Sequence, residues 1–295
     1  MNSNVLLLLL ATLFWGLNFH LGKVMFEYVS PNVAAFWRFL IGTGGVLFLS
    51  ISSFPPLEKI KNHIGGAALV GFIGLFGFIF FFTQGLHNTS AINGALIVAL
   101  NPVITLLLTA IFQGYRIKPK DLIGMTVALI GVCYLLTGGN IQQILSIDFA
   151  LGDIYFLIAV VMFGLQNIWI RKYSTGLGSR PFTLLTNLFC LIGFTVLLPF
   201  EAEGTFTPAS NRFWLATLGM GLLGTTLSYY FWNLGIKRVG PNKGSIFLNT
   251  IPLFVAILAV PFGAELYFFH LVSAALILSG LIIVQVNFRS SSPRS

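Results

Sequence analysis

The chain has 295 residues, of which 56% are hydrophobic and only 8% are charged, and its mean hydropathy is +0.91. Soluble domains carry about a quarter charged residues, so this composition excludes a globular protein covered by water. The net charge of +8 does not indicate nucleic-acid binding, because the cations form short clusters between apolar runs, as in the loops of membrane proteins.

Charged and Gly/Pro-rich breaks divide the chain into apolar runs of about 18 to 24 residues, the length that crosses about 30 Å of hydrocarbon as a helix. The predicted spans are 4–26, 31–52, 65–84, 91–112, 121–138, 152–170, 181–200, 213–233, 243–262 and 268–287. With a cytoplasmic N-terminus, only Lys23 and Arg212 fall outside, Arg38 lies within a span, and every other Lys and Arg is inside. This distribution predicts an all-α polytopic membrane protein of ten transmembrane helices with both termini in the cytoplasm.

The chain carries an internal repeat. A shift of 150 residues aligns these pairs: Gly71 with Gly221, Gly74 with Gly224, Gly85 with Gly235, Gly94 with Gly244, Pro31 with Pro181, and Pro102 with Pro252. In the first helix the shift is 148, which places Asn18 on Gln166. Five helices per repeat is an odd number, so the repeats cross the membrane in opposite directions, an architecture typical of secondary transporters. We expect five-helix repeats over 1–140 and 150–288 and a cytoplasmic tail over 289–295.

Several short motifs resemble those of a known family. They are the segment 14–18 in the first helix, 37–39 after Pro31, and 263–265 at the end of the ninth helix. Together with the repeat, they make the chain similar to the drug/metabolite transporter superfamily of the EamA type. The resemblance implies export or exchange of amino acids, nucleobases and other metabolites across a bacterial inner membrane. In the first repeat, 114–115 reads Gly-Tyr where such repeats often end in Gly-Glu, so we expect the two gates to differ chemically.

Amides and aromatic rings inside the predicted spans are the candidates for a substrate site, because polar groups in hydrocarbon are costly unless they face the bundle interior or a wet cavity. The predicted substrate-binding residues are Trp15, Asn18, Phe19, Gln84, Gln166, Trp169, Tyr230 and Asn249. Asn18 and Gln166 stand out because they are repeat partners, and Asn249 because Pro252 frees a backbone carbonyl nearby. Two alternatives remain open: ordinary interhelical hydrogen bonds for the amides, and a membrane-interface position for Tyr230.

Arg38 is a cation inside the second span, about 10 Å along the helix from its start. We predict that it pairs with Glu265 at the periplasmic side and sets the geometry of a gate. The repeat partners of these two residues are Leu188 and Tyr115, so cation and acid are missing together from the other side. The alternative is a snorkelling arginine bonded to backbone carbonyls, with Glu265 in water.

Two further features bear on gating and coupling. Pro102 and Pro252 are the predicted gating or structural residues of the fourth and ninth helices, since proline removes a backbone donor. His20 is the candidate proton carrier, and its alternative is a histidine that only forms an interior hydrogen bond. None of the eight acidic residues lies near the midpoint of a predicted helix, which argues against obligatory proton coupling and against strongly cationic substrates.

The predicted function is therefore secondary transport of small neutral metabolites, in the first place amino acids including aromatic ones, by alternating access, as an exporter or facilitator. A proton-coupled multidrug or nucleobase exporter and a membrane channel remain as alternatives. An enzyme is not expected, because histidines and acids are not gathered at a common depth. We expect a small-molecule substrate, a lipid bilayer as surroundings, no nucleic acid, no metal or other cofactor, and a monomer or weak homodimer.

Overall fold

The structure is a computed structural model that describes residues 3–89, 91–140, 142, 150–201 and 206–285. Within these residues the regular elements are all helical. Nine helices among them are long and apolar enough to cross a membrane. The predicted tail over 289–295 lies outside the described residues. The all-α polytopic class expected from the sequence is confirmed.

Six of the expected spans are single helices whose ends agree with the prediction to within a few residues. They are α1 (Ser3–Phe26), α2 (Pro31–Ser50), α7 (Pro119–Leu136), α9 (Leu151–Tyr173), α10 (Ser179–Leu197) and α15 (Phe268–Gln285). Short 3-10 turns, η1 (Ile51–Ser53) and η3 (Leu198–Phe200), extend α2 and α10. In α1 the buried positions include Leu8, Ala11, Trp15, Asn18 and Gly22. This spacing of three and four residues is that of one helix face.

The third and eighth spans each contain a π-helical segment. The third consists of α3 (Leu57–Ala68), η2 (Leu69–Phe76) and α4 (Gly77–Asn88), and the eighth of α11 (Asn211–Gly221), η4 (Leu222–Leu227) and α12 (Ser228–Val239). The third therefore begins at Leu57 and not at 65, because charged side chains in its first turns do not end a helix. The eighth is not among the nine apolar helices, since Thr225, Thr226 and Ser228 make it more polar.

The fourth and ninth spans are interrupted. The fourth consists of α5 (Ala91–Val98) and α6 (Asn101–Gln113), and the ninth of α13 (Pro241–Ser245), η5 (Ile246–Thr250), α14 (Ile251–Ala259) and η6 (Val260–Phe262). Pro102 and Pro252 each stand in the first turn of a new helix, α6 and α14. Proline is tolerated in the first turn because no intrahelical donor is needed there.

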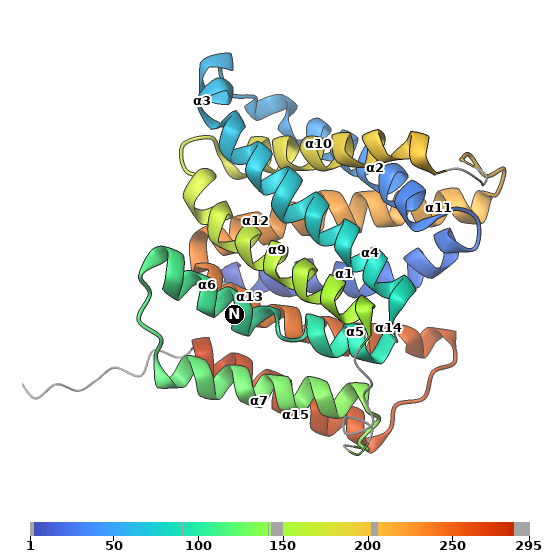
Figure 1. Ribbon diagram of the computed structural model, residues 1–295, viewed down its shortest axis with the longest axis vertical. Coiled ribbons are helices and arrows are strands. Elements are labelled where there is room, and N and C mark those ends of the chain that lie inside the picture. The colour runs from blue at the N-terminus through green and yellow to red at the C-terminus, as the bar shows by residue number, and fades with distance from the viewer. Residues whose placement is uncertain (1–2, 90, 141, 143–149, 202–205, 286–295) are drawn as a thin grey trace, which may run out of the picture.

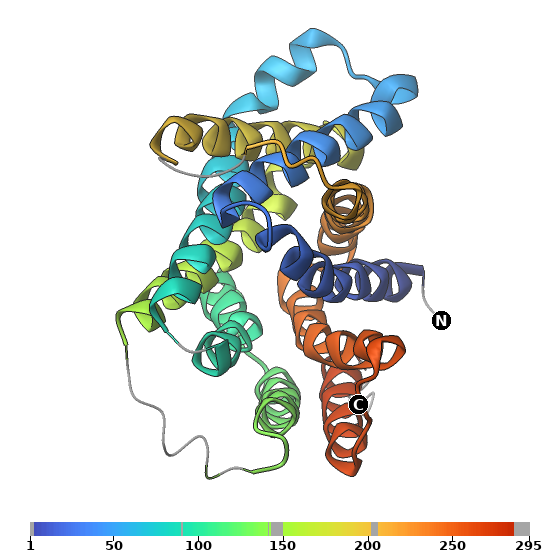
Figure 2. The same cartoon turned by 90° about the vertical axis from the view of Figure 1, so that its right-hand side faces the viewer.

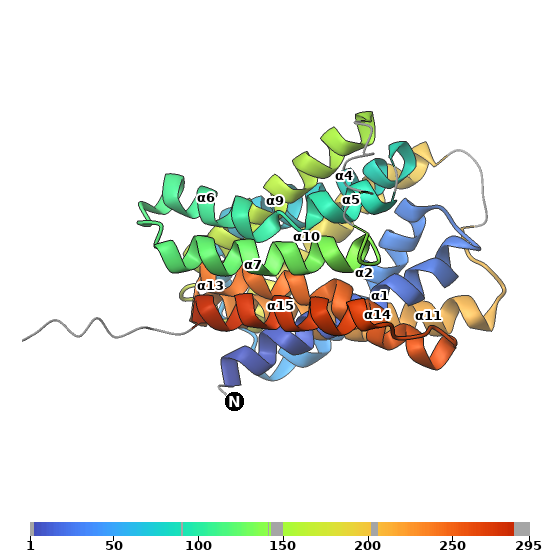
Figure 3. The same cartoon turned by 90° about the horizontal axis from the view of Figure 1, so that it is seen from below.

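The two halves of the chain are interleaved. The first helix of the chain, α1, packs against α12 and α14, whereas α9, which opens the second half, packs against α4 and α6. Likewise α2 packs on η4 and α10 on η2. The last helices of the halves, α7 and α15, lie side by side at one end of the long axis (Figures 1, 2 and 3). Each contact has its counterpart when the halves are exchanged, as an inverted repeat requires.

Two glycines in the π segments make contacts that are related by the repeat symmetry. A Cβ atom on Gly74 would lie 2.7 Å from Cβ of Gln166, and one on Gly224 would meet the side-chain oxygen of Asn18. These two contacts are related by the repeat, because it pairs both the glycines and the amides. Small residues thus let η2 approach α9, and η4 approach α1, closely.

A second pair of glycine contacts corrects the alignment of α2 with α10. A Cβ atom on Gly221 would lie 2.6 Å from Cγ2 of Ile41 and 3.3 Å from the carbonyl of Arg38. One on Gly71 would lie 2.6 Å from Cβ of Phe189 and 2.7 Å from the carbonyl of Thr186. The structural counterpart of Arg38 is therefore Thr186 and not Leu188.

Candidate functional site

Four aromatic rings meet in the interior between α1, α9 and α12. The Trp15 ring lies 5.0 Å from Trp232, 5.2 Å from Tyr229 and 5.9 Å from Phe163, measured between centroids. All four side chains are buried, and we refer to them as the central aromatic cluster. Trp15 and Phe163 are repeat partners under the shift that aligns the first helices of the two halves. Their contact therefore marks the pseudo-two-fold axis.

Polar side chains connect this cluster to the surrounding helices. Nε1 of Trp232 donates to Oδ1 of Asn167 at 2.9 Å, and Nδ2 of Asn167 is 3.3 Å from Oγ1 of Thr105. On the other side of α12, Nδ2 of Asn233 donates to Oγ1 of Thr183 at 2.8 Å. These bonds join α12 to α9, α6 and α10, so buried hydrogen bonds connect α12 to helices of both halves.

The π segment η4 gathers a second set of polar groups. Nδ2 of Asn18 donates to the Gly224 carbonyl at 3.4 Å, and Nη2 of Arg38 donates to the same oxygen at 3.2 Å. Nε of Arg38 donates to Oγ1 of Thr225 at 2.8 Å. A π turn lacks the i→i+4 bonds of an α-helix, and such turns are frequent at functional sites. Here it presents a carbonyl and a hydroxyl to two other helices.

Several buried polar atoms in this interior have no hydrogen-bond partner among the described residues. They are Nε1 of Trp15, Oδ1 of Asn18, Oδ1 of Asn101, Oε1 of Gln166, Oδ1 and Nδ2 of Asn187, Oδ1 of Asn233 and Oδ1 of Asn249. Buried polar atoms are paired in the great majority of cases, and each unpaired one costs about 1–3 kcal/mol. Asn18 and Gln166 follow Trp15 and Phe163 by three residues, so their unpaired oxygens lie on the same helix faces as the central aromatic cluster. Rings with a few polar groups beside them are typical of a site for a small molecule.

The predicted substrate-binding residues fall into two groups. Trp15, Asn18, Gln166 and Asn249 are all buried. Trp15 belongs to the central aromatic cluster, and Asn18 and Gln166 occupy equivalent positions against the π segments. Asn249 lies in η5. The next residue, Thr250, forms a hydrogen bond with Thr12 of α1, and their hydroxyl oxygens are 2.9 Å apart.

The other four predicted substrate-binding residues do not belong to the central aromatic cluster. Phe19 is 48% exposed, on the outer face of α1. Tyr230 lies under the Arg180 guanidinium, 5.8 Å from it, one residue away from the clustered Tyr229. Gln84 and Trp169 are half-buried on α4 and α9.

Sequence reasoning did not identify four members of the site, which are Phe163, Asn167, Tyr229 and Trp232. The repeat could have identified Phe163, because it is the partner of Trp15. Asn167 is the partner of Phe19, so the symmetry gives no reason to expect an amide there.

The expected Arg38–Glu265 ion pair is wrong for this structure. Arg38 is turned towards η4 and bonds to neutral groups. Glu265 is exposed in the loop after η6, where Oε2 accepts a bond from the Tyr267 hydroxyl at 2.8 Å. The pair fails because α2 packs against η4, α10 and α11, whereas α14 packs against α1 and α15.

The ends of α6 and η6 differ in chemistry, as the missing acid of the first repeat led us to expect. Both helices end at a left-handed glycine, Gly114 or Gly263. In the first repeat the Tyr115 hydroxyl donates to Oδ2 of Asp121 at 2.7 Å. The pKa of Tyr115 is raised to about 12, mainly by partial burial and to a smaller extent by the hydrogen bond to Asp121. Tyr115 is therefore a neutral donor where the second repeat has an acid, Glu265.

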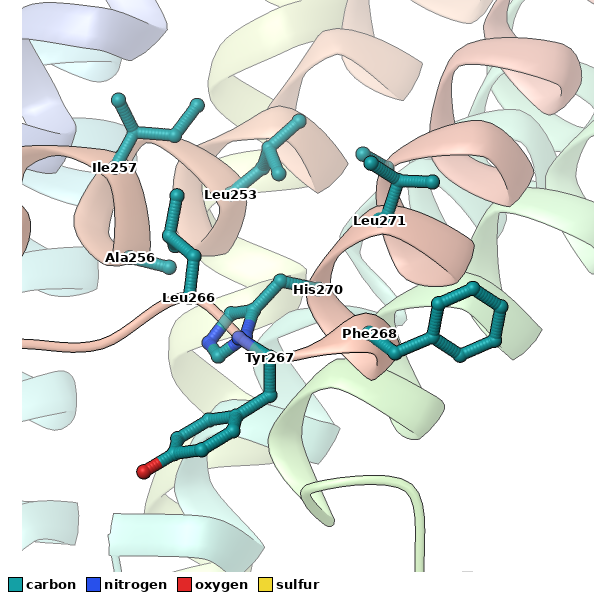
Figure 4. Close-up of a pocket in the computed structure, with 9 residues that line it drawn as sticks. Leu253, Ala256, Ile257, Leu266, Tyr267, Phe268, His270 and Leu271 are labelled. Carbon is teal, nitrogen blue, oxygen red and sulfur yellow. The ribbon is translucent and has the colours of Figure 1, made fainter.

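Two other features of the described residues do not belong to this site. A cavity of about 470 Å³ lies between α14 and α15 (Figure 4), lined by Leu253, Ala256, Ile257, Leu266, Tyr267, Phe268, His270, Leu271 and Ala274. It contains none of the predicted substrate-binding residues, and its apolar lining suits lipid.

His20, the candidate proton carrier, has Nε2 3.1 Å from the Val255 carbonyl of α14. No group of three His, Cys, Asp or Glu side chains suited to a metal occurs among the described residues.

Comparison with known proteins gives the family. The model of the EamA-like transporter family matches residues 2–137 and again 150–286. "Uncharacterized transporter YyaM" of Bacillus subtilis is 29% identical over 284 residues, which cover 95% of this chain and 92% of that protein. "Aromatic amino acid exporter YddG" of Ancylobacter novellus is 24% identical over 227 residues, 74% of this chain and 75% of that protein.

The fold has also been observed experimentally. A crystal structure superposes with a TM-score of 0.80 over 96% of this chain and 97% of the other, at 22% identity. The matched relatives are transporters and not enzymes, in agreement with the expectation from the sequence. The two family matches, which together span nearly the whole chain, and the all-helical interleaved fold lead to one conclusion: the chain belongs to the EamA-like transporter family and is a multi-pass membrane transporter.

Proposed function

We propose that the protein is a secondary transporter of small neutral amino acids, aromatic ones included, which works by alternating access as an exporter or facilitator. The observation that carries the proposal is the central aromatic cluster, which lies beside buried polar atoms without partners. Binding sites for small molecules are mostly apolar and aromatic, with a few polar groups that orient the ligand. An aromatic amino acid offers a ring for the cluster and polar ends for the amides.

The position of the cluster supports alternating access. Trp15 and Phe163 come from the first helices of the two halves, and their contact lies on the axis that exchanges these halves. In inverted-repeat transporters a midplane site at the repeat interface is opened to each side in turn. Trp15 of α1 contacts the other three rings, so a substrate that binds among them has to move α1 away from α9 or α12.

The chemistry of the cluster favours transport without obligatory proton coupling. No Asp, Glu or His belongs to it, and the candidate proton carrier His20 contacts a backbone carbonyl of α14. Transport would then follow the gradient of the substrate itself. The relative that is named as an aromatic amino acid exporter supports both the substrate class and the outward direction.

Counterflow in liposomes tests the substrate. Purified protein in liposomes preloaded with unlabelled phenylalanine should take up labelled phenylalanine transiently above equilibrium, with no pH gradient imposed. His20→Ala should behave like the unchanged protein. Counterflow with a nucleobase and with no neutral amino acid, or uptake that depends on a proton gradient and is lost in His20→Ala with binding intact, would contradict the proposal.

We further propose an inner-membrane location with both termini in the cytoplasm, repeats over 1–140 and 150–288, and a monomer or weak homodimer. The charge distribution supports this orientation, because nearly all Lys and Arg residues lie on one side. Reporter fusions at Asn140 and Asn211 should score as periplasmic, and fusions at Lys118 and Gly178 as cytoplasmic. A reversed score at any of the four sites would exclude this topology.

A further inference from the structure

Arg38 is placed where a cation is costly. It lies on α2 about 10 Å from the start of the helix at Pro31, and its side chain is turned inward against η4. A charged arginine within the hydrocarbon costs on the order of 3 kcal/mol on lenient scales, and such residues commonly mark the path of a substrate or ion. The guanidinium stays charged in proteins, so it needs either an anion or a specific polar environment.

The protein supplies Arg38 with neutral partners. These are the Thr225 hydroxyl at 2.8 Å, the Gly224 carbonyl at 3.2 Å and the Phe39 ring at 5.3 Å. The guanidinium also forms a side-chain hydrogen bond with Tyr229 and interacts electrostatically with the Cys190 thiol. These groups orient the side chain, but none of them balances its charge.

The acids that the structure describes are engaged elsewhere. Their partners are Arg212 for Glu27, Ser30 and Asn32 for Glu201, Tyr115 for Asp121, Thr89 for Asp153, and Tyr267 for Glu265. Glu58 is exposed in the first turn of α3. Among the described residues, therefore, no carboxylate pairs with Arg38.

The orientation of Arg38 leaves part of its donor fork available. Nε and Nη2 bond to η4, and a side-chain hydrogen bond joins the guanidinium to Tyr229, so three of its five N–H donors are engaged. Arginine binds carboxylates well because its parallel N–H groups match the two oxygens. The neighbouring Tyr229 belongs to the central aromatic cluster, and Asn18 shares the Gly224 carbonyl with Arg38. The guanidinium and the rings are thus adjacent parts of one site.

We propose that Arg38 binds the carboxylate of the transported substrate, whose apolar part contacts the central aromatic cluster. This inference rests on the proposed function and narrows it to compounds with a carboxylate. A carboxylate carries one charge and matches the single arginine, whereas a phosphate carries nearly two. No second cation interacts with Arg38 among the described residues.

The test compares ligands that differ only in the carboxylate, with thermal unfolding of the full-length protein in detergent as the readout. Phenylacetate should raise the Tm of the unchanged protein in a saturable manner, and phenylacetamide and inorganic phosphate should not. Arg38→Gln should weaken phenylacetate binding at least tenfold. Arg38→Lys, which keeps the charge and loses the fork, should bind phenylacetate with intermediate affinity. The control is Arg212→Gln, which removes an exposed arginine paired with Glu27 and should keep the original affinity.

Three results would overturn the proposal: no Tm shift with phenylacetate in the unchanged protein, equal shifts with phenylacetamide or phosphate, or an unaltered phenylacetate affinity in Arg38→Gln. If Arg38→Gln does not fold, Arg38→Lys decides, and an affinity equal to that of the unchanged protein overturns the proposal. Phenylacetate has no ammonium group and its binding requires no transport. A failure of amino-acid counterflow is therefore distinguishable from a failure of carboxylate binding at Arg38.

Discussion

Replacing Trp232 with alanine is expected to lower the free energy of unfolding by about 3–5 kcal/mol and to abolish counterflow. The side chain is 0% exposed and is the largest of the fully buried ones among the described residues. It contacts Trp15 at 5.0 Å and Phe163 at 6.0 Å, between centroids. Alanine would leave a cavity where α1, α9 and α12 meet, and closely packed helices collapse only partly into such a space.

Trp232→Phe separates the hydrogen bond of this residue from its packing. Phenylalanine keeps most of the ring but removes the Nε1 donor, so the buried Oδ1 of Asn167 loses its partner at 2.9 Å. An unpaired buried acceptor costs about 1–3 kcal/mol. We expect stability intermediate between tryptophan and alanine, and a counterflow rate lowered about tenfold, which corresponds to about 1.4 kcal/mol.

The control for both substitutions is Phe48→Ala. Phe48 is 75% exposed on α2, where it meets lipid, so its loss should change the stability little. Chemical unfolding in mixed micelles and counterflow measure the two effects. A Trp232→Ala protein as stable as Phe48→Ala would show that the central aromatic cluster contributes little to the fold.

The number and order of the helices could be predicted because each span has to bury its backbone in a run of apolar residues. The start of the third span could not, because a charge ends the hydrophobic stretch and not the helix, so Glu58 and Lys59 lie inside α3. The interruptions of the fourth and ninth spans were not predicted, because Pro102 and Pro252 were recognised only as residues that lack a backbone donor, and this does not show where the preceding helix ends.

The candidate site was accessible to sequence reasoning only in part. Trp15, Asn18 and Gln166 could be found because they are polar or repeat-related. The choice between Tyr229 and Tyr230 depends on η4: a π turn holds one more residue than an α turn, and each residue turns a helix by about 100°. The hydrophobic pattern does not reveal this rotation. Similarly, the partners of Arg38 follow from the packing of α2 on η4, which hydropathy does not specify.

Gly74→Ala is expected to lower the free energy of unfolding by about 1–3 kcal/mol, the usual effect of overpacking. The added Cβ would lie 2.7 Å from Cβ and 3.1 Å from Cα of Gln166. A Cα atom moves only with its helix, so α9 would have to shift away from η2. Because α9 also carries Phe163, this shift should reduce counterflow as well.

The repeat-related exchange Gly224→Ala should act differently, because its Cβ would meet the terminal amide of Asn18, the end of a flexible side chain. That amide can rotate away, and the higher helix propensity of alanine, about 1 kcal/mol, offsets the loss of its long bond to the Gly224 carbonyl at 3.4 Å. We therefore expect a stability near that of the unchanged protein together with weaker substrate binding. Gly44→Ala is the matched control, since apart from the adjacent backbone of its own helix no heavy atom lies within 4 Å of its added Cβ. Unfolding in mixed micelles should therefore rank Gly74→Ala clearly below Gly224→Ala and Gly44→Ala. Equal stability of the three would contradict the close approach of η2 to α9, and unaltered substrate affinity in Gly224→Ala would exclude Asn18 from the binding site.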